Sequence, residues 1–387
     1  MSAPRTHPEV TAAWAAAQDA ADPLSRFRDQ FLIPSGPDGA PCLYFAGPHP
    51  WMPYHELLTA ETARLVGALP IEVVVANTLT VNLHLLMASF YRPTPERPRI
   101  AIEAGAFPSD QYAVASQARF HGLDPRQAVL ELDHRTLLEQ LDQQGPSISL
   151  LLLGQPNYLS GQAFDVPEVV RLANRHGFAV GLDCAHGAGN LALRLHDWGV
   201  DFAAWCNYKY LNAGPGGLGG IFVHERHAKR PELPRFAGWW GHDKATRFQM
   251  GPEFKPAEGA EGWQLSNPPI LQLAALRASM EIFDAAGIEA LRARGDRLTA
   301  ALEAVLGGLP PGRVELVTPA GPAHRGSMLT VRVREGARGL VERLQARGAV
   351  CDFRNPDIIR ITPAPLYGSF ADVARLGGLL TEELGRG

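Results

Sequence analysis

The sequence predicts an α/β protein with a mostly parallel central sheet and a smaller C-terminal α/β domain. From about residue 60 onward, short extended segments alternate with helical segments. Several extended segments are continuous apolar runs, which is typical of strands that are buried on both faces of a parallel sheet. After Asn267-Pro268-Pro269 the pattern changes to shorter strands and helices, which indicates the second domain.

The beginning of the chain predicts an N-terminal arm. Residues 12–22 are rich in alanine and predict a short helix that ends before a proline. The stretch from Pro34 to Pro53 is dense in proline and glycine, so we expect irregular backbone there, with one short strand at Cys42–Phe45. We assign residues 1–48 to this arm and expect it to pack with the small domain.

Residues 49–284 form the predicted large domain. Apolar residues at helical spacing predict helices at Ala60–Ala68, Val81–Ser89, Asp110–Phe120 and Pro167–Gly177. Extended or β-branched runs predict strands at Glu72–Val75, Arg99–Glu103, Ser147–Leu153, Ala179–Leu182, Phe202–Cys206 and Gly220–His224.

Residues 285–387 form the predicted small domain, which a connecting helix precedes. Ile270–Phe283 is apolar nearly all round, so we expect a buried helix that Gly287 ends. A second helix follows, with Ile288, Leu291, Leu298, Leu302 and Val305 on one face. The remaining pattern predicts strands at Met328–Val333, Val350–Phe353 and Ile358–Ile361, and helices at Gly336–Arg347 and Ser369–Leu384.

Composition and charge exclude several classes of protein. The 387 residues suggest two or three domains, and the formal net charge of −4 argues against a polybasic nucleic-acid or membrane binder. The N-terminal residues carry charge and proline where a secretory signal needs an apolar run, and no uninterrupted apolar stretch is long enough to span a membrane. The 4 cysteines are scattered singly, which fits a reducing compartment. We therefore expect a cytoplasmic protein.

Polar residues follow three of the predicted strands. Asp183-Cys184-Ala185-His186 follows one strand, and Asn207-Tyr208-Lys209 follows another. Asn77-Thr78-Leu79-Thr80 follows a third strand and precedes a helix, where backbone amides can hold a phosphate. Ligands of open α/β sheets bind at such strand ends.

A carboxylate, a lysine and a phosphate cradle at neighbouring strand ends are what pyridoxal 5′-phosphate (PLP) needs. The carboxylate keeps the pyridine nitrogen protonated, the lysine forms a Schiff base, and an aromatic or imidazole face such as that of His186 can stack on the ring. Each cluster also has an ordinary structural explanation, as a helix cap or a solvated surface lysine. The ordered set of all three is what favours PLP.

Several longer segments resemble kynureninase, a fold-type I PLP enzyme of the class V aminotransferase group. They span about residues 70–370, and the most specific are NYKYLNAGPGG and LSNPPIL. The other matching segments are EVVVANTLTVNLHLLMASFYRPTPERPRI, EAGAFPSDQYAVASQ, GLDCAHGAGN, GWWGHDKATRF and CDFRNPDIIRITPAPLYGSF.

The resemblance implies PLP-dependent hydrolysis of L-kynurenine, or of 3-hydroxykynurenine, to anthranilate or 3-hydroxyanthranilate and L-alanine. It implies a homodimer with active sites at the subunit interface and a place in tryptophan catabolism and NAD biosynthesis. The residues that it places in catalysis are Lys209, Asp183 and Tyr208. The residues that it places at the cofactor are Leu79, Thr80, Phe107, Asp110, Asp183, His186, Tyr208, Lys209, Trp239 and Asn267, with Trp239 and Asn267 coming from the partner subunit. Arg360 would bind the substrate α-carboxylate, and His242 would lie at the aromatic end of the substrate.

The sequence departs from this family near residue 47. Kynureninases usually carry a Gly-Asn-Ser-Leu-Gly segment after the first strand, followed by a helix. Here Tyr44-Phe45-Ala46-Gly47 runs directly into Pro48-His49-Pro50-Trp51, so this segment and its helix are missing. Since the missing residues help to surround the substrate ring, His49 and Trp51 are our candidates to replace them, and the departure bears on substrate identity more than on the cofactor.

Two other motifs do not indicate separate sites. Residues 214–219 match GxGxxG, but a predicted strand follows them where a dinucleotide site needs a helix, so we expect a flexible turn near Lys209. His224-Glu225-Arg226-His227 lacks the spacing of metal ligands and a third ligand, so we expect solvated surface and no metal site.

Two other functions remain open. A cysteine desulfurase or β-lyase has the same fold but usually needs a reactive cysteine on a C-terminal loop, whereas Cys351 is predicted to lie in a strand. A non-catalytic protein of this fold is the other alternative, and the retained lysine, aspartate and arginine argue against it.

Overall fold

The computed structural model describes residues 11–30, 35, 38–41 and 51–385. The chain divides into two compact units, Met1–Trp51 and Met52–Gly387. In the first unit, helix α1 (Ala12–Ala21) begins after Thr11, whose hydroxyl accepts a hydrogen bond from the backbone N–H of Trp14 at 3.2 Å. The predicted N-terminal helix is therefore confirmed, while the predicted strand at Cys42–Phe45 lies outside the described residues. The packing of this arm with the small domain stays a prediction.

The second unit contains a seven-stranded sheet with the order β1-β7-β6-β5-β4-β2-β3. Its strands are β1 (Val73–Val75), β2 (Arg99–Glu103), β3 (Val129–Leu132), β4 (Ile148–Gly154), β5 (Ala179–Asp183), β6 (Phe202–Cys206) and β7 (Gly219–Val223). The successive pairs from β3 to β6 are parallel, and only β7 runs antiparallel to its neighbours β6 and β1. The predicted mostly parallel sheet is confirmed.

The sheet is buried on both faces because its strand residues alternate between two apolar clusters. In β4, Leu151 and Leu153 belong to one cluster and Leu150 and Leu152 to the other. Helix α2 (Thr59–Val66) precedes β1, and the helices between the strands are α3 (Leu79–Phe90), α4 (Pro108–Phe120), α5 (Pro125–Ala128), α6 (Leu137–Gln144), α7 (Val166–His176) and α8 (Leu195–Trp198).

Strand β3 and helices α5, α6 and α8 were not predicted. The strand is four residues long and lies at the edge of the sheet, where only Leu132 is fully buried. An edge strand needs no continuous apolar run, so the sequence pattern that identifies the inner strands is absent here.

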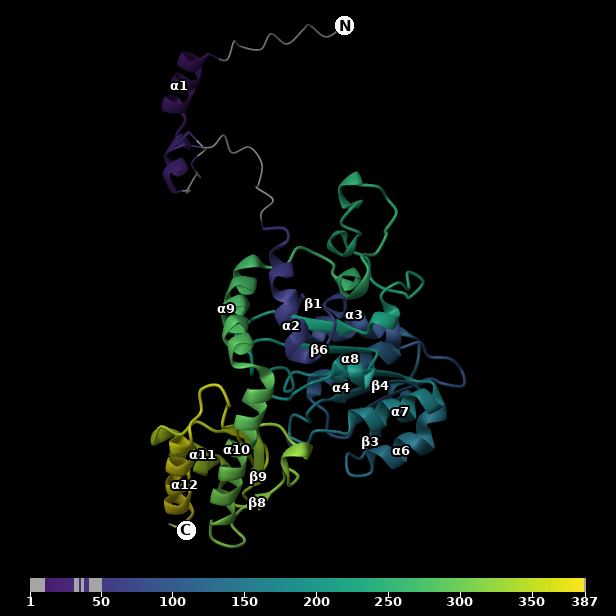
Figure 1. Cartoon of the computed structure of the whole chain (residues 1–387), viewed down its shortest axis with the longest axis vertical. Helices are drawn as coiled ribbons and strands as arrows, with labels where there is room; N and C mark the ends of the chain where they lie inside the picture. Colours follow the sequence, from purple (N-terminus) through teal and green to yellow (C-terminus); the bar gives the residue numbers. More distant parts are fainter. Residues whose placement is uncertain (1–10, 31–34, 36–37, 42–50, 386–387) are drawn as a thin grey trace. The chain divides into compact units, whose positions relative to one another are not determined.

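Two consecutive helices, α9 (Ile270–Ala286) and α10 (Ile288–Gly307), lead from the large sheet to a second sheet (Figure 1). Helix α9 is not buried all round, contrary to the prediction. Leu273 and Phe283 are buried, but Leu271 is 88% exposed and Ile282 is 55% exposed. The apolar content of a helix does not by itself fix how many of its faces are covered.

The second sheet is antiparallel, with the order β10-β11-β9-β8. It consists of β8 (Glu315–Leu316), β9 (Leu329–Arg332), β10 (Asp352–Arg354) and β11 (Ile358–Ile361), with helices α11 (Ala337–Ala346) and α12 (Phe370–Gly385). It has its own apolar cluster. Both sheets belong to one compact unit, so the predicted boundary near residue 284 stays a prediction. No helix among the described residues is long and apolar enough to cross a membrane.

Candidate active site

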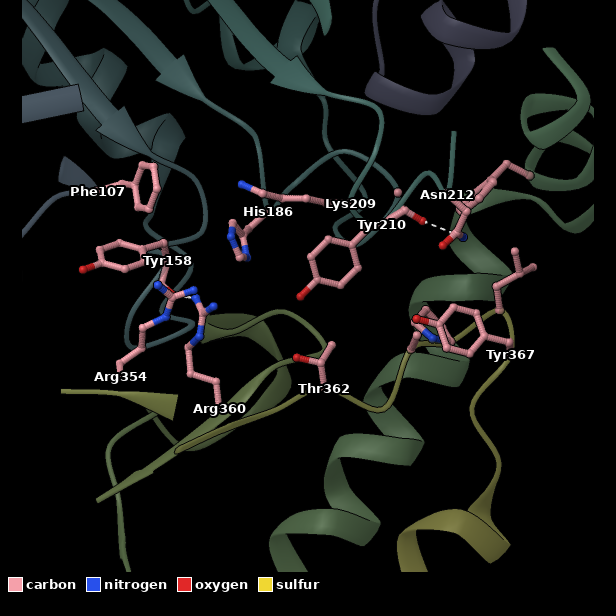
Figure 2. Close-up of a pocket in the computed structure, with 15 residues that line it drawn as sticks. Phe107, Tyr158, His186, Lys209, Tyr210, Asn212, Arg354, Arg360, Thr362 and Tyr367 are labelled. Atoms are coloured by element: carbon pink, nitrogen blue, oxygen red, sulfur yellow. Dashed lines mark hydrogen bonds between the residues drawn. The ribbon is translucent and has the colours of Figure 1, made fainter. Parts of the chain in front are cut away.

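The carboxyl ends of β2, β4, β5 and β6 meet at one edge of the large sheet, and a pocket of ≈ 330 Å³ opens between this edge and strand β11. Figure 2 shows Lys209, His186 and Tyr210 on one side of this pocket and Arg354, Arg360 and Thr362 on the other. A smaller cavity of ≈ 20 Å³ shares Phe107, His186 and Lys209 with the pocket and continues to Asp183. The two cavities bring together the main residues predicted from the strand ends.

Lys209 lies in the turn that follows β6. Its Nζ is 5.8 Å from the centroid of the Phe107 ring, and within the described part of the chain it makes no hydrogen bond or ion pair. The chain's other lysines behave differently, since Lys229, Lys244 and Lys255 each pair with a carboxylate. Lys209 therefore carries an amine that is free to react in a pocket. The predicted turn after it is confirmed, with Gly214 and Gly216 at φ of 84° and 72°.

Asp183 ends β5 and is buried. Its Oδ1 accepts a hydrogen bond from the backbone N–H of Ala185 at 2.7 Å, and Asp110 is hydrogen-bonded to it. Burial and the Asp183 charge raise the pKa of Asp110 well above its ordinary value, so the Asp110 carboxyl is protonated. Its O–H group is therefore the donor in the hydrogen bond to Asp183. Burial also raises the pKa of Asp183, while the Ala185 N–H, Asp110 and Lys209 oppose that rise. The negative charge of the pair therefore rests on Asp183.

Phe107 and His186 line both cavities. Phe107 is the N-cap residue of α4, and its ring meets the Tyr158 ring edge-on at 5.2 Å. The Nδ1 atom of His186 is buried without a hydrogen-bond partner among the described residues. Burial, followed by the Lys209 and Arg360 charges, lowers the pKa of His186 well below its ordinary value, so this imidazole is neutral.

The first turn of α3 lies beside the small cavity. Leu79 lines that cavity, and Thr80 shares a hydrogen bond of 2.8 Å with Ser109 at the start of α4. Two helix N-termini therefore lie side by side, and their free backbone N–H groups suit a phosphate. The sequence analysis missed Ser109, although it belongs to the quoted FPSD segment.

Tyr208 is half-exposed and lines neither cavity, and burial raises the pKa of its phenol to about 12.

Arg360 extends from β11 into the pocket and is well covered, with 10% of its side chain exposed. Its Nε donates to Asp352 Oδ2 at 2.6 Å, and its Nη1 donates to the Tyr158 carbonyl at 2.6 Å. These two bonds fix the guanidinium plane, so that a carboxylate can bind it in a defined orientation. The sequence analysis missed Asp352 and also Arg354, which shares Asp352 with Arg360.

Glu103 is a third site residue that the sequence analysis missed. It ends β2, lies in the small cavity, and is 2% exposed. Burial, with a further contribution from the Asp183 charge, raises the pKa of its carboxyl to about 7. Its position at the end of a predicted strand, like that of Asp183, was the sequence feature that could have identified it as a site residue.

The other predicted site residues do not line these cavities. Trp239 is 39% exposed and packs on Phe248, and His242 shares a hydrogen bond of 3.0 Å with Thr246. Asn267 is exposed. Their predicted roles stay predictions, as do those of Trp51, which ends the first unit, and of His49, which lies outside the described residues.

The His224–His227 segment is not simply solvated surface. His227 is buried and its Nε2 lies 2.9 Å from Asp201 Oδ1, while His224 and His196 lie beside the buried carboxylate of Glu72. These three are close enough to share a metal ion. The two imidazole rings stack with planes 24° apart, and the Nδ1 atom of each lies near the same Glu72 oxygen, at 3.0 and 3.6 Å. The contacts describe a hydrogen-bonded cluster.

The residues of the pocket suit PLP. A lysine amine without a partner, a buried carboxylate, an aromatic ring and a neutral imidazole with an unpaired nitrogen surround one space in the described part of the chain. The small cavity alone has room for about one water, so a pyridine ring in front of Asp183 would extend into the adjoining larger pocket.

Comparison with solved structures defines the class of the fold. The cystine C–S lyase C-DES, solved as a lysine-to-alanine mutant with glycine covalently linked to its PLP cofactor, superposes with a TM-score of 0.73 at 18% identity, covering 95% of this chain and 92% of that chain. The cysteine desulfurase CsdA from Escherichia coli also superposes with a TM-score of 0.73, at 17% identity, covering 95% of this chain and 92% of that chain. The fold is therefore that of the fold-type I PLP-dependent enzymes.

Sequence comparison gives the family. The kynureninase C-terminal domain matches residues 291–380. Kynureninase from Myxococcus xanthus is 56% identical over an alignment of 398 positions, which covers 92% of this chain and 93% of the relative. Kynureninase from Koribacter versatilis is 53% identical over 95% of this chain and 96% of the relative. The chain belongs to the kynureninase family. The aligned region of 398 positions exceeds the 387 residues of this chain, so the relative contains residues that this chain lacks.

Proposed function

We propose that this chain uses PLP to hydrolyse L-kynurenine, or its 3-hydroxy form, to the corresponding anthranilate and L-alanine, a step of tryptophan catabolism and NAD biosynthesis. The observation that carries the proposal is the convergence of Lys209, Asp183 and Arg360 on two connected cavities. A covalent anchor, a counter-charge for the pyridine nitrogen and a carboxylate clamp are the three functions that PLP chemistry on an amino acid requires.

Five residues would hold the cofactor within one chain. Lys209 would anchor it through its amine, Asp183 would compensate the charge of its pyridine nitrogen, and Phe107 would pack against its ring. The N-terminal amides of Leu79 and Thr80 would bind its phosphate. When bound, the cofactor supplies an electron sink for the carbon atoms next to the amino group.

The remaining steps belong to side chains of this protein. Arg360 would bind the α-carboxylate, and the Lys209 amine would remove and return protons at the α-carbon. The neutral imidazole of His186 would lie beside the ring without adding charge. Tyr208 lies outside both cavities of one chain, and we keep it as the candidate that would donate a proton to the β-carbon, which becomes the methyl carbon of alanine. Burial raises the pKa of its phenol to about 12, so it is protonated at neutral pH.

The aromatic end of the substrate would lie in the part of the pocket lined by Asn212, Phe283, Leu366 and Tyr367. We keep His49, Trp51 and His242 as candidates for the ring contacts that the missing segment makes in other kynureninases. The values of kcat/KM for kynurenine and 3-hydroxykynurenine, measured side by side, decide which substrate this chain prefers.

A homodimer accounts for two predicted cofactor residues that stay outside the cavities of one chain. Between β7 and α9 lies a long segment with only short helical turns, drawn in green above the large sheet in Figure 1, and Trp239 belongs to this segment. Its exposed apolar side chains are Phe236, Trp239, Phe248 and Met250. A concentration of exposed apolar side chains is typical of a protein interface, and a second copy would bring Trp239 and Asn267 to the phosphate. The free cysteines of the described chain support the further proposal of a cytoplasmic enzyme.

The desulfurase alternative is not favoured. Its nucleophile would be Cys351, but this half-buried thiol lines a neighbouring cavity and not the pocket of Lys209. Burial and the nearby Asp352 charge raise its pKa to about 11, so it is a neutral thiol at physiological pH and a poor nucleophile.

A turnover assay tests the proposed function directly. The purified protein, loaded with PLP, is given L-kynurenine, and anthranilate is followed by fluorescence while alanine is quantified. We expect the two products in equal amounts. Release of alanine from L-cysteine with no product from either kynurenine would establish the desulfurase alternative, and the absence of turnover with all of these substrates would contradict the enzyme assignment.

A further inference from the structure

Glu103 is a buried carboxyl whose contacts give it a specific role in this site. It lines the small cavity together with Asp110, Asp183 and Lys209. A buried carboxyl costs free energy unless it is hydrogen-bonded. Its partners therefore indicate what it does.

Both oxygens of Glu103 accept hydrogen bonds from the end of β4 and the loop that follows it. The backbone N–H of Gly154 donates to Oε2 at 3.2 Å, and Nδ2 of Asn157 donates to Oε1 at 3.4 Å. The amide of Asn157 cannot be reversed, because its Oδ1 accepts from the backbone N–H groups of Leu159 and Ser160 at 3.0 and 2.9 Å. Glu103 thus anchors the beginning of this loop from two directions.

Gly154 provides the space that the Glu103 carboxyl occupies. A Cβ atom at residue 154 would lie 2.6 Å from Glu103 Oε1, which is closer than nonbonded atoms approach. Any side chain at this position therefore displaces the carboxyl.

The anchored loop also reaches the carboxylate clamp. Tyr158 follows Asn157, and its carbonyl oxygen accepts the 2.6 Å hydrogen bond from Arg360 Nη1. The Tyr158 ring meets the edge of Phe107. The side chain that Glu103 holds and the carbonyl that orients Arg360 thus belong to adjacent residues.

The charge of Glu103 matters because other ionisable groups face it. Asp183, Asp110, His186 and Lys209 all line the same cavity. A carboxyl whose pKa burial raises to about 7 carries less negative charge beside Asp183 than an ordinary glutamate does.

We propose that Glu103 is a positioning residue of this site: its hydrogen bonds to Gly154 and Asn157 fix the loop that orients Arg360. This inference rests on the proposed function, because it assumes that PLP binds in front of Asp183 and that Arg360 binds the substrate carboxylate. Its test therefore begins with wild-type protein that binds PLP and cleaves kynurenine. If the wild type does neither, the proposed function fails, and the role of Glu103 at the cofactor fails with it.

The decisive variant is Glu103→Gln, measured as the holoenzyme. Glutamine has the same size, but it offers one acceptor where two donors converge. We expect the dissociation constants of PLP and of L-alanine, used as a probe of the carboxylate clamp, to rise ~10-fold each. We also expect the pH midpoint of the visible absorbance of bound PLP to shift. The matched control is Glu131→Gln on the neighbouring strand β3, whose exposed side chain lies outside the cavities; it leaves all three values unchanged.

A second variant covers the possibility that Glu103→Gln does not fold. Gly154→Ala keeps Glu103 but pushes its carboxyl aside, so it should weaken alanine binding and shift the same pH midpoint in the same direction. Wild-type affinities together with a wild-type pH midpoint, in whichever of these variants folds, would overturn the role of Glu103.

Discussion

At the scale of single residues, the site depends on how charge is distributed among buried groups. Asp183 carries the negative charge because Asp110 donates a hydrogen bond to it, and His186 stays neutral through burial. Arg360 forms an ion pair with Asp352 at 2.6 Å beside the pocket. These states suit a site that binds one cationic ring and one carboxylate.

Replacing Arg360 should affect substrate binding more than turnover. We expect Arg360→Ala to raise KM for kynurenine by about 10-fold or more, since it removes a charge-assisted pair of hydrogen bonds to the carboxylate. Arg334→Ala is the matched control, because Arg334 is an exposed residue next to β9. A wild-type KM in Arg360→Ala would exclude the carboxylate role.

The raised pKa of Glu103 makes stability depend on pH. The unfolded carboxyl ionises near its ordinary value of 4.5 and the folded one near about 7. The stabilising contribution of the buried neutral form is therefore complete below pH 4.5 and is lost as pH rises through 7, by up to about 1.4 kcal/mol per pH unit. Between pH 5 and pH 7 in urea unfolding, the free energy of unfolding of the wild type should fall relative to that of Glu103→Gln. Parallel pH dependences of the two proteins would show that Glu103 is ionised throughout.

At the scale of elements, the ends of the parallel strands determine where the chemistry lies. The positions of Asp183 and Lys209 were predictable because continuous apolar runs identify inner strands, and polar residues directly after such strands meet at one edge. Glu103, Asp352 and Arg354 were not singled out, because their roles depend on partners from other elements that no spacing in the sequence reveals. The exposed face of α9 was missed for a similar reason, since it depends on which neighbours cover the helix.

Helix α7 offers a test of how single elements are stabilised. Its N-cap residue Asp165 accepts a hydrogen bond from the backbone N–H of Glu168 at 3.2 Å. Asp165→Ala should lower the free energy of unfolding by about 1 kcal/mol, whereas Asp165→Asn keeps an N-cap acceptor and should stay close to wild type. Chemical unfolding of the three proteins provides the comparison. Equal losses in both variants would mean that the carboxylate charge, and not the cap, stabilises the helix.

At the scale of the whole molecule, the central question is whether one active site needs two chains. Lys209→Ala and Asn267→Ala should each be inactive as purified variants. In a hybrid dimer, one site would combine Lys209 of one chain with Asn267 of the other. Mixing the variants under conditions of subunit exchange should therefore restore part of the activity, because one complete site forms per hybrid. If hybrids form, as shown by differently tagged chains, and activity does not return, Asn267 acts within its own chain or not at all.

The anchoring lysine is the central claim, and one chemical measurement tests it most directly. The chain has four lysines, and three of them, Lys229, Lys244 and Lys255, are paired with carboxylates. Borohydride reduction of the PLP-loaded protein, followed by mass spectrometry of its peptides, identifies the lysine that carries the cofactor. The account predicts the label on Lys209 alone. A label on one of the other three lysines, or retention of PLP without a reducible covalent bond, would contradict it.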